Sequence, residues 1–447
     1  RVLVYTAVLW AIILAAAVWL AFGPGVNNEL LNWDDDRNFV ENESFRGLGS
    51  QQLHWAWTTY HMGVWQPVSW ILLSLQYTLF GLDPWGFRVF SIVIHSANCA
   101  LLYAVMVSIL RLADPIRPML STRLACGIIA LLFAVHPLRV EAVNWISCQP
   151  YLPAIGFFLL GVLTYLKGAQ TDDRMSRVWL LAAWVCYCLA VASKAVAVTL
   201  PVVLLILDWY PLRRIGGPKS WELTRTTRIV VEKIPFFLVA ILVSISAAQA
   251  KAFNESRLPL EQYQIGSILA QSAYGYCFYL WKTLCPTGLC AYYRLPDNLS
   301  VAAWPYWAIA CALVIATIST WRLRRKLPGL WAAWLAYGVI LLPNAGVIQF
   351  SAQIAADRYA YLATMSLLVL VAAALLHLIR RMNRAFLITS TLAGMACLIP
   401  LVVIARQHVM NWQNSVTLWK VALDADSQCA VAAANLGHAL MGREDFP

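Results

Sequence analysis

Residues 31–42 read LNWDDDRNFVEN, and this stretch decides how the rest of the chain is interpreted. It holds three consecutive carboxylates, Asp34, Asp35 and Asp36, shortly after an apolar run that begins at Val2. Adjacent carboxylates repel one another and need water, a cation or a partner base, so they cannot lie in the hydrocarbon of a membrane. We therefore expect the acidic cluster just outside a membrane, where the chain first leaves it, and we expect the chemistry of the protein there.

The composition supports a protein that crosses the membrane many times. Hydrophobic residues make up 61% of the 447 residues and charged residues 12%, whereas soluble domains carry roughly 25% charged residues. A span needs about 20 apolar residues, so the chain has room for about a dozen crossings and no large soluble domain. The first run, residues 2–22, is too long for a signal peptide and predicts a retained span. Because the chain starts at Arg1, we expect it to be part of a longer protein.

The net charge of +11 does not indicate a nucleic-acid partner. The basic residues form short clusters between apolar runs, which is the pattern of loops on the inner side of a membrane. The 11 cysteines lie mostly inside apolar runs and form no CxxC motif, so they predict no zinc site.

With Arg1 placed inside, most Lys and Arg residues fall on the inner side and most acidic residues, including the loop 23–84, on the outer side. The fold class is then all-α: a polytopic helical bundle of about 11 spans. The spans are predicted near 2–22, 86–110, 123–138, 150–167, 178–194, 196–210, 234–250, 301–321, 330–345, 359–379 and 385–405. Two further stretches, 66–81 and 265–284, are rich in Trp, Tyr and Gln and are expected at or re-entering from the outer interface.

Residues 1–405 therefore form the predicted transmembrane domain, and residues 406–447 begin a second region. Its spacing of Trp, Leu and Ala and its Asn-Leu-Gly sequence are those of a truncated tetratricopeptide (TPR) helix pair. Such repeats grip a peptide or another protein. We expect this region on the outer side, with further repeats beyond it.

Four polar motifs are predicted at the outer face. In the first, Asp34 or Asp35 is a candidate general base for a hydroxyl, with its neighbour holding it or a divalent cation. The alternative is a solvated loop whose acids cap a helix. In the second, Pro137 ends a helix and should turn His136, Arg139 and Glu141 toward the rim, although a histidine at a span end is often a capping residue.

The other two motifs supply cations. Lys194 lies between two apolar runs, where a lysine costs about 3 kcal/mol at the bilayer centre, so it snorkels, pairs or binds an anion. Arg358, beside Asp357, opens a later span and suits a phosphate in the headgroup region, because a guanidinium forks onto phosphate oxygens. An Asp357–Arg358 pair that only anchors the helix is the alternative. Together the four motifs indicate group transfer from a lipid-linked phosphate to a hydroxyl.

The chain also resembles a known family. The segments WDD (33–35), WQPVSW (65–70), HPLRVEAVNWIS (136–147), SKAVAVTLPVVLLILDWYPLRR (193–214), VEKIPFF (231–237), ADRYAYL (356–362) and the tail from WQNSVTLW to ANLGHAL (412–440) carry the resemblance. They are similar, in this order, to bacterial membrane proteins with TPR tails and to the transmembrane-and-TPR O-mannosyltransferases, which belong to the GT-C class of glycosyltransferases. The resemblance implies a GT-C-like bundle, a catalytic Asp34 or Asp35, and Arg358 as the residue that binds the lipid phosphate.

The resulting prediction is a bacterial inner-membrane glycosyltransferase whose acidic loop and C-terminus face the periplasm. It would move a hexose, mannose by analogy, from a polyprenyl-phosphate donor to a protein hydroxyl. Arg358, with Lys194 or Arg139, would neutralise the phosphate, while His136 and Glu141 orient these groups. Two other functions stay open: a non-catalytic scaffold that recruits partners through its repeats, and a transporter, which would be expected to carry polar groups at mid-membrane.

Overall fold

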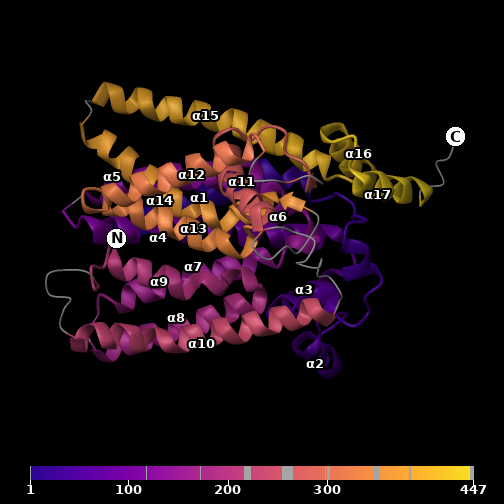
Figure 1. Cartoon of the computed structure of the whole chain (residues 1–447), viewed down its shortest axis with the longest axis horizontal. Helices are drawn as coiled ribbons and strands as arrows, with labels where there is room; N and C mark the ends of the chain where they lie inside the picture. The colour runs from indigo at the N-terminus through magenta and orange to yellow at the C-terminus, as the bar shows by residue number, and fades with distance from the viewer. Residues whose placement is uncertain are drawn as a thin grey trace.

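The computed structural model describes residues 2–116, 118–171, 173–215, 223–253, 265–296, 299, 303–346, 353–381 and 384–442. Within these residues the chain is almost entirely helical, which confirms the all-α prediction (Figure 1). The helices are α1 (Val2–Phe22), α2 (Ser50–Thr58), α3 (Pro67–Phe80), α4 (Pro84–Ala113), α5 (Met119–Ala134), α6 (Val140–Asn144), α7 (Tyr151–Gly168), α8 (Asp173–Ser193), α9 (Leu200–Trp209), α10 (Leu223–Phe253), α11 (Ile265–Leu284), α12 (Tyr306–Arg322), α13 (Pro328–Leu341), α14 (Ala360–Arg381), α15 (Arg384–Asn411), α16 (Ser415–Ala425) and α17 (Ala430–Met441). Short helical turns include η2 (Asp36–Val40), η4 (Pro137–Arg139), η5 (Ile146–Cys148), η6 (Ala195–Thr199) and η10 (Asp357–Tyr359).

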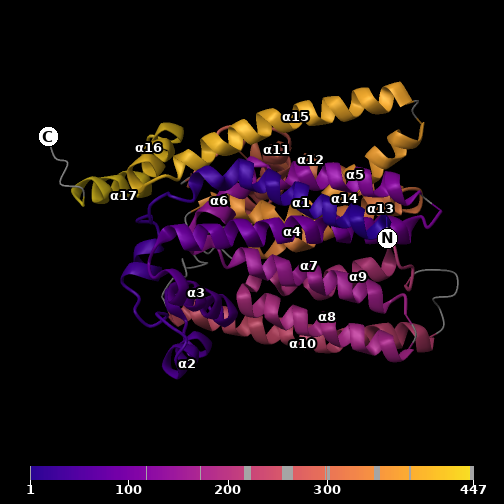
Figure 2. The same ribbon diagram turned by 180° about the vertical axis from the view of Figure 1, so that it is seen from behind.

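The long helices run along the long axis of the molecule, as expected for a bundle that spans a membrane (Figures 1 and 2). Seven helices of the described residues are long and apolar enough to cross a membrane, or eight if α5 and the segment 137–144, bent by 63°, form one span. These match the predicted spans at 2–22, 86–110, 150–167, 178–194, 234–250, 301–321 and 359–379, with the bent pair at 123–138.

The other predicted crossings look different in the structure. The segment 196–210 is the turn η6 followed by α9, which has only 10 residues, and 330–345 contains α13, which has 14. Both helices are shorter than the roughly 20 residues a straight crossing needs. The segment 385–405 lies within α15. Of the basic positions predicted on the inner side, Arg1, Arg117 and Lys219 lie outside the described residues. The total of 11 crossings stays a prediction.

Close helix packing explains why small residues occur where two helices touch. Helix association inside a bilayer depends on close packing and small residues, because lipid is as apolar as leucine. Gly127 of α5 illustrates this, since a Cβ atom there would lie 2.2 Å from the indole ring of Trp10 on α1.

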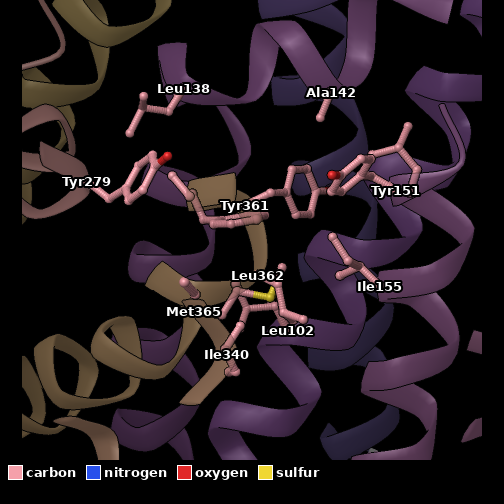
Figure 3. Packing of buried hydrophobic residues seen from close by; sticks show 14 of the residues in the cluster. Leu102, Leu138, Ala142, Tyr151, Ile155, Tyr279, Ile340, Tyr361, Leu362 and Met365 are labelled. Carbon is pink, nitrogen blue, oxygen red and sulfur yellow. The ribbon is translucent and has the colours of Figure 1, made fainter. Parts of the chain in front are cut away.

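In Figure 3, Tyr151, Tyr279 and Tyr361 separate Leu138 and Ala142 from the apolar contacts around Leu102, Ile340 and Met365. This part of the core joins η4 and α6 to α4, α7, α11, α13 and α14, and the same cluster of buried residues continues into α1, α5, α8 and α9.

One end of the bundle carries the acidic loop. The segment between α1 and α4, with the turn η2 and helices α2 and α3, lies at the same end as α16 and α17, on the right in Figure 1 and the left in Figure 2. The connection between α7 and α8 and the start of α10 lie at the opposite end. The acidic loop and the C-terminal helix pair therefore share one end of the molecule.

Local sequence explains how the elements at this end begin. Asp83 caps α4 by accepting a hydrogen bond from the Trp85 amide at 2.9 Å, and Asn414 caps α16 through the Thr417 amide at 3.0 Å. Pro67 opens α3, where its missing N–H costs nothing. A two-stranded antiparallel sheet, β1 (Tyr293–Arg294) with β2 (Gln353–Ala355), pairs Tyr293 with Ala355. Because β2 leads into η10, this sheet sets the position of Arg358.

Candidate functional site

Asp35 is a buried anchor of the acidic loop. Its side chain has no exposed surface, and its carboxylate accepts hydrogen bonds from the Leu31 amide (3.1 Å), the Ser147 amide (3.0 Å) and the Ser147 hydroxyl (2.5 Å). Burial raises the pKa of Asp35 to about 6, although the Ser147 hydrogen bond and the charge of Arg88 act in the opposite direction. The three donors fix the loop to the turn η5.

Asp34 has a different environment from its neighbour. Its backbone φ is +67°, in the left-handed region that non-glycine residues rarely adopt. Among the described residues, no hydrogen bond or ion pair of the Asp34 carboxylate is found. Burial raises its pKa, while the charges of Arg358, Arg37 and Lys194 lower it and that of Asp36 adds to the rise. Asp34 is thus a strained, unpartnered carboxylate in the field of nearby cations.

Arg358 is held rigidly on the side of this carboxylate. Its Nη1 pairs with Glu141 Oε1, and its amide donates to Glu141 Oε2 at 2.7 Å. Its Nη2 donates to Gln353 Oε1 at 3.3 Å, and its guanidinium lies 5.5 Å from the ring centroid of Trp145. Glu141 is only 1% exposed, so it acts as a fixed counter-ion that orients Arg358. The structure therefore brings the two candidate residues Arg358 and Glu141 together.

Lys194 supplies the second cation. It lies between α8 and η6, and its Nζ donates to Gln66 Oε1 at 2.9 Å, 5.6 Å from the ring centroid of Tyr151. Lys194 and Arg358 are the two cations from the predicted set that act on Asp34. Gln66, from the segment before α3, ties Lys194 to the end of the bundle that carries the acidic loop.

His136 and Arg139 lie inside the protein and not on an open rim, which differs from the expectation for Pro137. Their exposed fractions are 6% and 1%. His136 Nδ1 accepts the Leu138 amide at 3.3 Å, so its Nε2 carries the proton that bonds the Thr283 carbonyl at 3.1 Å. Arg139 donates to Thr364 Oγ1 at 2.9 Å and lies over the ring of Phe133 at 4.3 Å. Pro137 opens the turn η4, which buries both side chains.

Asp357 also points away from Asp34. Its Oδ1 accepts a hydrogen bond from the Tyr293 hydroxyl at 3.0 Å, and its Oδ2 lies 3.9 Å from His408 Nε2 on α15. The side chain is buried, so Asp357 joins β1 and α15 to the start of α14.

The described residues around Asp34 and Asp35 form no cluster of metal ligands. Among the residues that the structure describes, no group of three or more His, Cys, Asp or Glu side chains could hold a metal ion. The three donors around Asp35 already use its carboxylate.

Several residues of the site are not apparent from sequence alone. Ser147 and Gln66 belong to motifs that carry the family resemblance, but nothing near them in sequence names Asp35 or Lys194 as their partners. Arg88, fully inside α4, bonds the carbonyls of Asn28, Glu29 (2.6 Å) and Asn144 (3.1 Å), and so fixes the start of the loop. A buried arginine within an apolar run is the only signal that could have indicated it.

Comparison with known proteins gives the same family that the motifs indicate. The chain is 22% identical to protein O-mannosyl-transferase Tmtc3 of Drosophila melanogaster over 85% of this chain and 47% of that protein. It is also 22% identical to mouse TMTC3, over 85% and 43%, and 26% identical to human TMTC2 over 34% and 17%. These likenesses confirm the predicted resemblance. The chain spans about half the length of the curated relatives that it matches along most of its length, and no protein-family model matches it.

Solved structures were compared as well. The chain is similar to an oligosaccharyltransferase of Archaeoglobus fulgidus tethered to an acceptor peptide, with a TM-score of 0.46, 13% identity and coverage of 99% and 59% of the two chains. A second similar structure is ArnT of Cupriavidus metallidurans bound to undecaprenyl phosphate, with a TM-score of 0.38, 16% identity and coverage of 98% and 78%.

Proposed function

We propose that this protein is a membrane glycosyltransferase that moves a hexose from a polyprenyl-phosphate donor to a hydroxyl of an acceptor protein. Mannose is the proposed sugar because the curated relatives are O-mannosyl-transferases by name. The observation that carries the proposal is Asp34: a carboxylate on a strained backbone, without a hydrogen-bond partner in the described residues, whose pKa is raised by burial while the charges of Arg358 and Lys194 oppose the rise.

In the proposed reaction, Asp34 is the general base. Its carboxylate takes the proton of the acceptor hydroxyl as the hydroxyl oxygen forms a bond to the anomeric carbon of the sugar. The bond between that carbon and the phosphate oxygen breaks, and the phosphate leaves with the bonding electrons. A carboxylate already tied to several donors would be a poorer base, and this favours Asp34 over the saturated Asp35.

The leaving phosphate needs positive charge that is already in place. Arg358 is fixed by Glu141 and Gln353, and Lys194 is fixed by Gln66, so neither cation has to reorganise when charge develops on the phosphate. Such preorganised charge is worth most in a site shielded from water. Arg358 and Lys194 are therefore the proposed phosphate-binding residues, with Glu141 as the group that orients Arg358.

The remaining predicted residues take supporting positions in this proposal. His136, Arg139 and Asp357 form a buried layer next to the Glu141–Arg358 pair and hold η4 and η10 in place. The helix pair α16–α17 begins the proposed TPR region, which would present the acceptor polypeptide. The site end of the bundle would face the periplasm of a bacterial inner membrane, with α3 and α11 at that interface.

The first prediction concerns the three neighbouring aspartates. Membrane vesicles supplied with labelled polyprenyl-phosphate hexoses and periplasmic protein should show transfer by the wild type, and Asp34→Asn should lower the rate by about 100-fold or more, since a general base contributes on the order of 100- to 10,000-fold. Asp36→Asn is the matched control, because Asp36 lies two residues from Asp34 and its carboxylate, within the part of the chain that the structure describes, accepts a hydrogen bond from the Arg37 amide alone. Its rate should stay within about two-fold of the wild type.

Two outcomes would contradict this assignment. Equal rates for wild type and Asp34→Asn in folded protein would remove Asp34 as the base. Absence of transfer from every donor, with a correctly folded wild type, would favour the scaffold that recruits partners through its repeats.

A further inference from the structure

Asn32, two residues before Asp34, bonds the C-terminal helix pair through its backbone amide and through both polar atoms of its side chain. Its amide donates to Ser415 Oγ at 2.9 Å, and its Nδ2 donates to the Asn435 carbonyl at 2.8 Å. Its Oδ1 accepts the indole N–H of Trp419 at 2.7 Å. One side chain and its backbone thus join the acidic loop to both α16 and α17.

The next residue, Trp33, extends the same contact. Its ring stacks on Trp145 with centroids 4.4 Å apart and lies 5.4 Å from Trp419 and 6.0 Å from Trp412. Its carbonyl accepts the indole N–H of Trp145 at 2.9 Å. Trp33 is therefore held between the C-terminal helices on one side and the segment before η5 on the other.

The loop makes a continuous seam with the segment that links α15 to α16. Asn28 Nδ2 donates to the Val409 carbonyl at 3.1 Å, and the Glu29 amide donates to the Gln413 carbonyl at 2.8 Å. Residues 28–33 of the loop thus lie alongside residues 409–419. This seam consists mainly of directional hydrogen bonds to backbone groups, which fix the register of the two segments.

Asp34 lies between two anchored neighbours. On one side Asn32 and Trp33 are fixed by the C-terminal helices, and on the other Asp35 is fixed by Ser147. A left-handed backbone at a residue with a side chain persists only where the surroundings impose it. Neither anchor alone determines the conformation at Asp34. If the neighbours on one side were released, the backbone at Asp34 could rotate out of the left-handed region.

We propose that Asn32 is a positioning residue, and that the helix pair α16–α17 is one half of the clamp that holds Asp34 in its strained conformation. The pair is then part of the transfer site as well as the start of the acceptor-binding region. The catalytic consequence rests on the proposed function, whereas the positioning of the loop by the helix pair does not.

The test uses the full chain and two changes in the clamp. Asn32→Ala removes both side-chain bonds, and Trp419→Phe removes only the indole N–H that Oδ1 accepts. Arg294→Gln is the matched control, because the Arg294–Asp426 ion pair at 2.9 Å also joins the bundle to the helix pair, and both of its residues lie outside the acidic loop 23–84. Hydrogen exchange of the peptide covering residues 31–40 and the kinetics of transfer are measured for each variant.

Asn32→Ala should raise the exchange rate of the 31–40 peptide and lower kcat by about 100-fold, the effect expected when a reacting group is displaced by roughly an ångström. KM for the lipid donor should stay within about two-fold, because Arg358 and Lys194 are unaffected. The inflection of the pH–rate profile should move down toward that of an ordinary aspartate as Asp34 gains solvent. Trp419→Phe should show smaller changes in the same direction, and Arg294→Gln should match the wild type.

Unchanged exchange in both clamp variants would overturn the inference, whatever the activity. Faster exchange with an unchanged kcat would also overturn it, because the loop would then not need the clamp to place its base. If Asn32→Ala fails to fold, Trp419→Phe decides by the same two readouts. A wild type without any transfer would defeat the proposed function alone, and the exchange measurement would still decide the positioning.

Discussion

At the scale of single residues, two adjacent aspartates of one cluster have different environments, and the proposed function gives them different roles. Asp35 is saturated by three donors and Asp34 has none among the described residues. The sequence predicts that one of them is the base but cannot choose, because the distinction comes from Ser147, 112 residues away. A buried carboxylate with three donors is a structural group, while a strained one without partners is free to react.

The raised pKa of Asp35 predicts how the free energy of unfolding depends on pH. Its folded pKa of about 6 lies above the 3.8 of an ordinary aspartate, so its contribution to stability is complete below pH 4 and is lost as the pH rises toward 6. Between these values the free energy of unfolding of the wild type should fall by on the order of 2–3 kcal/mol relative to that of Asp35→Asn. Melting curves of both proteins in detergent between pH 4 and 7 measure this. Parallel curves for the two proteins would show that Asp35 does not titrate in this way.

At the scale of elements, the opposite end of the bundle has its own buried charge network. Asp208 at the end of α9 and Lys233 of α10 lie 2.8 Å apart, both at most 1% exposed. The Tyr165 hydroxyl of α7 lies 2.7 Å from both carboxylate oxygens of Asp208, and Arg214 pairs with Asp208 at 3.0 Å and with Glu232 at 2.7 Å. The network joins α7, α9 and α10 far from the acidic loop.

Breaking this network should destabilise the bundle strongly. Asp208→Asn leaves Lys233 buried without its main counter-ion, and removal of one partner of a buried pair costs about 3–5 kcal/mol. Arg228→Gln is the control, since Arg228 is 62% exposed and pairs with Glu232 at 3.8 Å, where surface pairs contribute about 1 kcal/mol or less. Thermal unfolding in lipid nanodiscs compares the two variants. A melting temperature of Asp208→Asn equal to that of Arg228→Gln would contradict the role of the network.

The elements also show what sequence can predict. Long apolar runs gave the position of α1 and of α4 to within a few residues, because a span needs about 20 apolar residues in one stretch. The same rule failed to anticipate that 196–210 divides into the turn η6 and the short helix α9, since both parts are equally apolar. Gln66 and Asn32 could not be found, because their partners are 128 and up to 403 residues away and carry no signal of the pairing.

At the scale of the whole molecule, the two ends differ. The acidic loop and the helix pair α16–α17 lie at one end, and the connection of α7 to α8 lies at the other (Figures 1 and 2). The basic clusters of the sequence predict that the second end faces the cytoplasm. The site and the C-terminal helices would then share the periplasmic side.

Reporter fusions test this orientation. Alkaline phosphatase fused after Gly442 should be active and green fluorescent protein fused there dark, because only the phosphatase folds to an active form in the periplasm. Fusions after Leu327, which follows the basic segment 322–326, should give the reverse pattern. The opposite result at either position would require the predicted topology to be redrawn.

The seam between Asn32 and α17 has a consequence for synthesis. Asn32 leaves the ribosome early, but Asn435 follows 403 residues later, which at about 5–20 residues per second is an interval of roughly 20–80 seconds. Throughout that interval the nascent chain contains Asp34 but lacks the complete helix pair α16–α17 that Asn32 contacts. If the proposed clamp is required, the order of translation delays a competent site until α17 has emerged, and a chain released before that point would not carry out the proposed transfer.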